Sequence, residues 1–111
     1  QTEAMCVIDV NSGKNIAKSK KQADKERAAL GVNMEAAAQV INQIRLRNIS
    51  GIIIIDFINM QEEASVKELL SYMKGLAKKE HITTNVVDMT PLGLVEMTRK
   101  NNGKTLKELI R

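Results

Sequence analysis

Short apolar runs alternate along this chain with stretches in which apolar residues recur at helical spacing. One run covers residues 4–10 and is followed by the turn-like sequence NSG. A second run, residues 52–56, places four isoleucines before an aspartate, and a third covers residues 83–89. Runs of this length bounded by turn residues predict β-strands. An isoleucine run that is apolar on both faces is typical of a central strand covered by helices.

Two amphipathic stripes separate these runs. The first predicts a helix that takes Asn33 as its N-cap and ends near Asn48; its apolar members are Met34, Ala37, Ile41 and Ile44. The second predicts a helix capped by the pair Asn59 and Glu62; its apolar members are Val66, Leu69, Leu70, Met73, Leu76 and Ala77.

The remaining segments carry weaker patterns. Residues 12–31 show little periodicity and predict a long loop, with a helical turn near 22–30 as the alternative. Residues 92–99 fit a helix or a strand, and we favour the helix; residues 106–110 suggest a short terminal helix. The order of strands and helices predicts an α/β fold: one small layered domain over residues 1–111, with a central, mainly parallel or mixed sheet covered by helices.

Composition narrows the class of protein. The chain has 111 residues and a net charge of +4. Six basic residues and two acids lie between Lys14 and Arg27, a surplus equal to the whole net charge. Such a segment fits either a polyanion-binding patch or a solvated loop. No apolar run approaches the roughly 20 residues of a membrane span. The single cysteine, Cys6, excludes an internal disulfide and favours the cytoplasm.

Two aspartates stand where strands end. Asp9 closes the first apolar run and Asp56 closes the isoleucine run. If these strands are parallel neighbours, both carboxylates emerge at one edge of the sheet, where α/β folds bind ligands. Two carboxylates so close repel each other unless a cation lies between them, and Mg²⁺ prefers such oxygen ligands. Asn11 could bind a carboxylate, a phosphate or a metal-bound water. The alternative is that Asp9 forms a turn and that Asp56 only ends its strand.

At these residues the sequence resembles a known family. The blocks QTEAMCVIDVNSGK, NMEAAAQVINQIRLRNISGIIIIDFINM and LGLVEMTRK are similar, in order, to the catalytic core of the ribonuclease E/G family. The resemblance implies that the chain is a fragment of a longer protein, its deoxyribonuclease-I-like catalytic subdomain. It also implies a cytoplasmic endonuclease that cleaves single-stranded RNA with Mg²⁺, or with Mn²⁺. Asp9 and Asp56 would bind the metal, and Asn11 would help to orient the site.

The resemblance also sets expectations for partners. Lys14, Arg45 and Arg47 are candidate RNA contacts, although the two arginines could equally be solvated at a helix end. A homo-oligomer is expected of the full-length protein, and no zinc site within this fragment. Where the family usually shows DFIDM, this chain has DFINM, so Asn59 replaces an acid. The isolated fragment is expected to cleave poorly, and the alternative function is a non-catalytic module for RNA binding or dimerisation.

Overall fold

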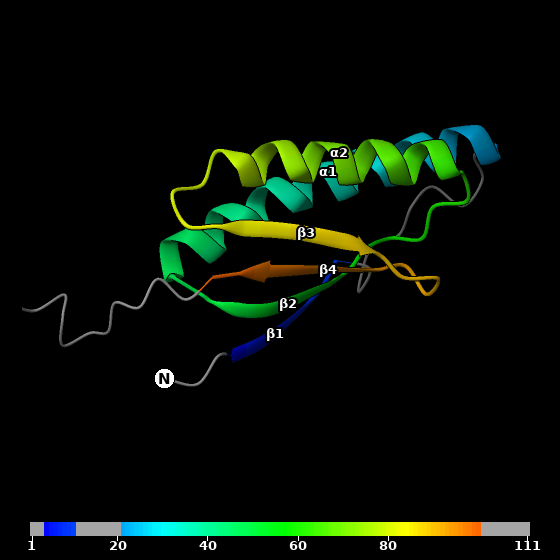
Figure 1. The fold of residues 1–111 in the computed structure, drawn as a ribbon. Helices are drawn as coiled ribbons and strands as arrows, with labels where there is room; N and C mark the ends of the chain where they lie inside the picture. Colours follow the sequence, from blue (N-terminus) through cyan, green and yellow to red (C-terminus); the bar gives the residue numbers. More distant parts are fainter. Residues whose placement is uncertain (1–3, 11–20, 101–111) are drawn as a thin grey trace, which may run out of the picture.

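Four strands and two helices make up the described part of the chain. The computed structural model describes residues 4–10 and 21–100. Its elements are β1 (Ala4–Asp9), α1 (Gln22–Arg47), β2 (Gly51–Asp56), α2 (Glu63–Lys78), β3 (Thr84–Met89) and β4 (Leu94–Arg99). The strands form one sheet in the order β1-β2-β4-β3, and both helices lie on the same side of it (Figure 1). The predicted α/β class is confirmed.

The sheet is mixed rather than mainly parallel. β2 pairs in parallel with β1, whereas β4 runs antiparallel to both β2 and β3. Within β2 the side chains alternate between the two faces. Ile53 and Ile55 are fully buried beneath the helices, whereas Ile52 is 41% exposed on the other face. Among the described residues, therefore, helices cover one face of the sheet and leave the other open.

Residues 92–99, which the sequence favoured as a helix, contain strand β4. A turn at Pro91–Gly93 joins β3 to β4: Gly93 adopts φ 87°, and its N–H donates to the Thr90 carbonyl at 2.9 Å. Val95, Met97 and Arg99 then point inward, with half-buried residues between them. This is the period of two expected of a strand. The alternation is hard to recognise in the sequence because one inward residue, Arg99, is charged.

Helix α1 begins at Gln22, so the predicted loop over residues 12–31 is wrong for the part that the structure describes. The alternative, a helical turn near 22–30, falls within this helix. The buried positions on its first three turns are Glu26, Ala29 and Asn33. These continue the stripe of Ala37, Val40, Ile41 and Ile44 at helical spacing, but two of them are polar. Asn33 is therefore a buried residue of the mid-helix and not an N-cap.

The end of α1 was predicted near Asn48, and the structure confirms it. Asn48 adopts the left-handed conformation (φ 52°, ψ 46°), which ends many helices, and its N–H donates to the Arg45 carbonyl. The buried guanidinium of Arg99 donates to the Asn48 side chain at 3.1 Å and to the Ile49 carbonyl at 2.8 Å. These bonds tie β4 to the end of α1. The predicted helix at 106–110 lies outside the described residues.

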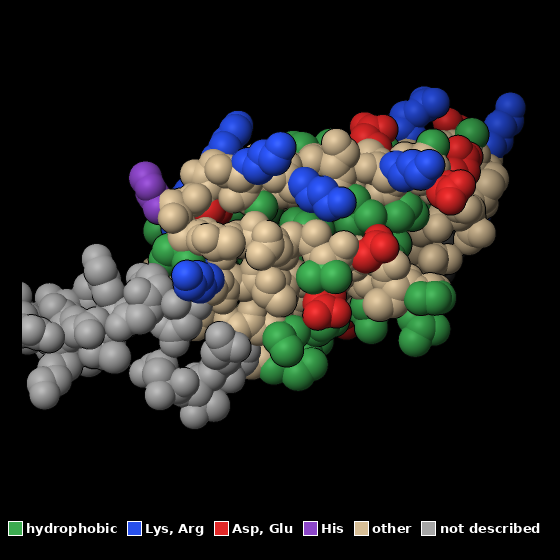
Figure 2. Space-filling view, in the orientation of Figure 1, with side chains coloured by type: hydrophobic (Ala, Val, Ile, Leu, Met, Phe, Trp, Pro, Cys, Tyr) green, Lys and Arg blue, Asp and Glu red, His purple; other side chains and the backbone are tan. Residues whose placement is uncertain are grey.

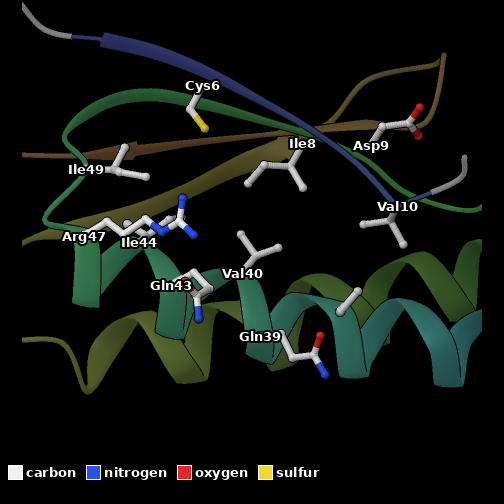
Figure 3. Close-up of a pocket in the computed structure, with 11 residues that line it drawn as sticks. Cys6, Ile8, Asp9, Val10, Gln39, Val40, Gln43, Ile44, Arg47 and Ile49 are labelled. Atoms are coloured by element: carbon white, nitrogen blue, oxygen red, sulfur yellow. The ribbon is translucent and has the colours of Figure 1, made fainter.

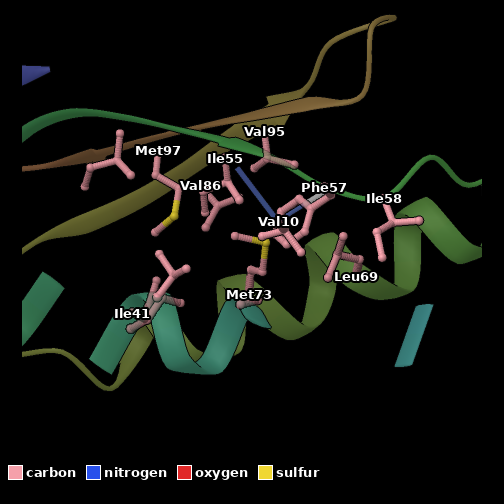
Figure 4. Packing of buried hydrophobic residues seen from close by; sticks show 14 of the residues in the cluster. Val10, Ile41, Ile55, Phe57, Ile58, Leu69, Met73, Val86, Val95 and Met97 are labelled. Atoms are coloured by element: carbon pink, nitrogen blue, oxygen red, sulfur yellow. The ribbon is translucent and has the colours of Figure 1, made fainter. Parts of the chain in front are cut away.

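The hydrophobic core lies between the helices and the inner face of the sheet (Figure 4). Leu69 and Met73 of α2 are fully buried, as are Val95 and Met97 of β4. Phe57, directly after β2, is 2% exposed. The core therefore extends beyond the end of β2 and anchors the connection that leads into α2.

The N-terminus of α2 is capped from another helix. No side chain at the Glu62 N-cap bonds to the helix, so the predicted Asn59–Glu62 capping pair is wrong. Instead, the Glu26 carboxylate of α1 accepts from the Gln61 N–H and the Glu62 N–H, both at 2.9 Å. A negative charge here also complements the positive end of the helix dipole.

The bonds to Glu26 shift its titration. Burial opposes ionisation and raises the pKa, but the two backbone N–H groups and the Ser65 hydroxyl lower it by more. The pKa of Glu26 therefore lies below the ordinary glutamate value, about 4.3. A carboxylate whose pKa is lowered by folding stabilises the fold at neutral pH. Its contribution is lost as the pH falls from the unfolded-state pKa through the folded-state pKa.

We predict that Glu26→Gln lowers the free energy of unfolding at pH 7 by about 1.5–3 kcal/mol, the scale of a hydrogen bond to a charged group. The gap between variant and wild type should narrow as the pH falls from the unfolded-state glutamate pKa, about 4.3, through the lower pKa of Glu26 in the fold. Urea unfolding at a series of pH values measures both effects. Glu68→Gln, on the exposed side of α2, serves as control and should change stability by less than ~0.5 kcal/mol. A gap that does not change with pH would contradict the capping role.

Candidate active site

The two strand-end aspartates lie side by side. Asp9 and Asp56 are the last residues of β1 and β2 and are paired in register across the parallel strands. Neighbouring strands lie about 4.8 Å apart, and residues paired in register point to the same face. The Val10 N–H donates to the Asp56 carbonyl at 2.9 Å, so the pairing continues past the end of β1. The two strands thus present both carboxylates at one edge.

Both carboxylates belong to the open face of the sheet. Along β1 the exposed residues are Met5, Val7 and Asp9, while Cys6 and Ile8 are half-buried on the helix side. Figure 3 shows Ile8 and Val10 pointing toward α1 and the Asp9 carboxylate pointing away from it. Asp56 follows the same alternation as Ile52, which is exposed on the open face. A ligand can therefore approach the aspartates without displacing a helix.

This pair of ligands fits a hard cation that keeps much of its water. Within the described ranges, no group of three or more His, Cys, Asp and Glu residues could hold a metal ion. A site built from Asp9 and Asp56 would supply two carboxylates and leave the other coordination positions to water and substrate. Mg²⁺ is bound in this way in many phosphate-handling sites, through one or two carboxylates plus phosphate oxygens.

The other predicted site residues do not join this pair. Asn11 and Lys14 lie outside the described residues. α1 ends three residues before β2 begins, so Arg45 and Arg47 lie near the amino end of β2, whereas Asp56 lies at its carboxyl end. The Arg45 guanidinium forms an ion pair with Glu80 at 3.5 Å and also bonds to the Asn42 side chain. Any contact of these arginines with RNA would therefore be separate from the aspartate pair.

A cleft of about 460 Å³ separates β1 from α1 on the helix side. Its lining is mostly apolar, from Ile8 and Val10 on β1 and from Val40 and Ile44 on α1 (Figure 3). Arg47 lies at one end, and the Asp9–Val10 end of β1 lies at the other. Asp9 also lines the cleft at this end, but its carboxylate points away from α1 toward the open face.

The sequence prediction missed two buried polar residues near this site. Glu26 and Asn33 are 5% and 0% exposed, and both bond to the connection between Asp56 and α2. A signal was present in their spacing: they lie seven residues apart, on the face of α1 that carries the apolar stripe. Polar residues at core positions of an amphipathic helix need buried partners, and these partners are distant in sequence.

Comparison with known proteins shows which family the chain is similar to. Residues 1–102 match the model of the Ribonuclease E/G family. The chain is 41% identical over 108 residues to Ribonuclease E of Synechocystis sp., covering 97% of this chain and 15% of that protein. It is 38% identical over 110 residues to Ribonuclease G of Haemophilus influenzae, and 36% identical to Ribonuclease G of Escherichia coli. These two matches each cover 99% of this chain and 22% of the relative.

Proposed function

Because the chain belongs to the ribonuclease E/G family, we propose that it forms the catalytic subdomain of a magnesium-dependent endoribonuclease that hydrolyses phosphodiester bonds in single-stranded RNA. The observation that carries the proposal is the in-register pairing of Asp9 with Asp56 on an open sheet face. The chain spans 15–22% of the length of these relatives, and the activity is proposed for the whole protein. RNA processing and decay in the cytoplasm would be its setting.

The chain's own residues have defined tasks in this reaction. Asp9 and Asp56 would hold Mg²⁺, or Mn²⁺, through carboxylate oxygens from two adjacent strands. The bound ion would supply a water activated for attack and would stabilise charge on the scissile phosphate. The paired strands fix the two carboxylates relative to each other, and the absence of a covering helix on this side of the described fold leaves room for an RNA strand. Outside the described residues, Asn11 would help to orient the phosphate and Lys14 would contact the backbone of the RNA.

A second candidate function is a non-catalytic module for RNA binding or dimerisation. One observation favours it: the open face carries exposed apolar side chains beside the aspartates. Met5 and Val7 are each 66% exposed and Ile52 is 41% exposed. Figure 2 shows hydrophobic side chains at the surface on the sheet side of the molecule. Light scattering would detect self-association through this face, and Met5→Ser with Val7→Ser would reduce it.

We predict that Asp9→Asn and Asp56→Asn, each made in the full-length protein, reduce cleavage of single-stranded RNA by roughly 100-fold or more, as when a transition-state-stabilising group is lost. RNA affinity in a filter-binding assay should change little, because the backbone of the RNA contributes most of the affinity through its contacts with basic residues. Glu68→Gln removes the same charge at a distant exposed position and should leave cleavage unchanged. Cleavage at the wild-type rate by both aspartate variants would refute the catalytic role and would favour the non-catalytic module for RNA binding or dimerisation.

We also predict that chelation of divalent ions abolishes cleavage and that Mg²⁺ or Mn²⁺ restores it.

Mn²⁺ is paramagnetic, so in an amide NMR titration it should broaden the signals of the residues around Asp9 and Asp56 first. Both aspartate variants should lose this broadening. Broadening centred on other residues, such as Glu62 and Glu63 at the start of α2, would contradict the assignment.

A further inference from the structure

A buried amide side chain bonds to the connection between Asp56 and α2 at the point nearest the aspartate. Asn33 lies in the middle of α1 and is fully buried. Its Nδ2 donates to the Ile58 carbonyl at 2.9 Å, and its Oδ1 accepts from the Ile58 N–H at 2.9 Å. One side chain therefore satisfies both backbone polar groups of Ile58, as a neighbouring strand would.

Ile58 follows Asp56 by only two residues. On the other side, the Val10 N–H of β1 donates to the Asp56 carbonyl at 2.9 Å. Between the two contacts lies Phe57, which is 2% exposed in the core. The backbone that carries the Asp56 carboxylate is thus fixed by β1 before the connection and by Asn33 after it.

The buried residues of α1 include polar ones where the helix faces this connection. The buried residues from Ala37 to Ile44 are all apolar and contribute to the hydrophobic core. The two buried polar residues, Glu26 and Asn33, both bond to backbone groups of residues 58–62. An apolar residue at position 33 could extend the core, but it would leave the Ile58 N–H and carbonyl unsatisfied. The helix therefore fixes the path of the chain that leaves the aspartate.

We propose that Asn33 is a positioning residue for the metal-dependent reaction. By clamping Ile58 it fixes the direction of the Asp56 carboxylate relative to Asp9, so that both can bind one ion. This inference rests on the proposed function. Ligand groups must be held within about 0.5 Å and 10–20° of their productive geometry, which explains the use of a buried side chain with two bonds. Asn33 does not contact the ion or the RNA.

The test compares two variants of the full-length protein that both lose buried contacts of α1. Asn33→Ala removes the clamp, and Ile44→Ala removes a core side chain of the same helix, eleven residues away and near the amino end of β2. Thermal unfolding gives the stability of each. The Mg²⁺ concentration for half-maximal cleavage is the readout, measured well below both unfolding temperatures. Asn33→Ala should raise it about 10-fold or more, the usual effect of removing a group that orients a metal ligand. Ile44→Ala should leave it within ~2-fold.

A double-variant experiment separates positioning from stability. In the Asp56→Asn background, Asn33→Ala should cause no further loss of the residual activity, because residues that act through one group are not additive. If Asn33→Ala does not fold, Asn33→Asp, which keeps the acceptor for the Ile58 N–H, is compared with Ile44→Ala in the same way. The proposal would be overturned if the position-33 variant and Ile44→Ala raised the Mg²⁺ concentration for half-maximal cleavage by the same factor. Retained cleavage by Asp9→Asn and Asp56→Asn would instead overturn the proposed function itself.

Discussion

The parallel pairing of β1 with β2 is the interaction on which the arrangement of this site depends. It brings together two strand ends that are 47 residues apart in the sequence, Asp9 and Asp56. The core sets the register: Ile53 and Ile55 occupy the inner face beneath the helices, and the half-buried Cys6 and Ile8 lie opposite them on β1. A slip of one residue would turn the exposed side chains of β1 toward the helices. Asp9 would then enter the apolar interior, which is costly for a carboxylate. Hydrophobic packing thus determines on which face the carboxylates lie.

This dependence explains which parts of the fold could be predicted from the sequence. The strands β1, β2 and β3 and the apolar half of α1 were predicted because their signals are local: short apolar runs and an unbroken helical stripe. The aspartate pair followed from the strand ends, because the carboxyl ends of parallel neighbours meet at one edge. The buried face of α2 was likewise predicted from its apolar stripe, whereas the residue that caps the helix was not.

The errors share one physical cause. Glu26, Asn33 and Arg99 are buried polar residues, and their partners lie 25 to 51 residues away along the chain. A buried charge or amide is unfavourable unless it has hydrogen-bond partners. Because these partners are distant in the sequence, the local pattern predicts that each of the three residues is exposed to solvent. With Glu26 and Asn33 predicted as exposed, the buried stripe of α1 is not recognised in its first turns. With Arg99 predicted as exposed, the alternation of inward and outward side chains along β4 is not recognised. The local pattern also assigns the cap of α2 to its neighbours in sequence, whereas the actual cap comes from the other helix.

Electrostatics connects the fold to the proposed chemistry. Two carboxylates on adjacent strands repel each other, and both repel the phosphates of an approaching RNA strand. Among the described residues, the exposed side chains Met5, Val7 and Ile52 on this face are apolar and carry no charge. Arg45 and Arg47 lie toward the amino end of β2, about five residues' length of strand away, roughly 17 Å. This length along the backbone exceeds the Debye length, about 10 Å at 0.1 M salt. Under the proposed function, a cation bound between the carboxylates would let Asp9, Asp56 and a phosphate come together. The proposed metal site would therefore depend on the same register that aligns the two strands.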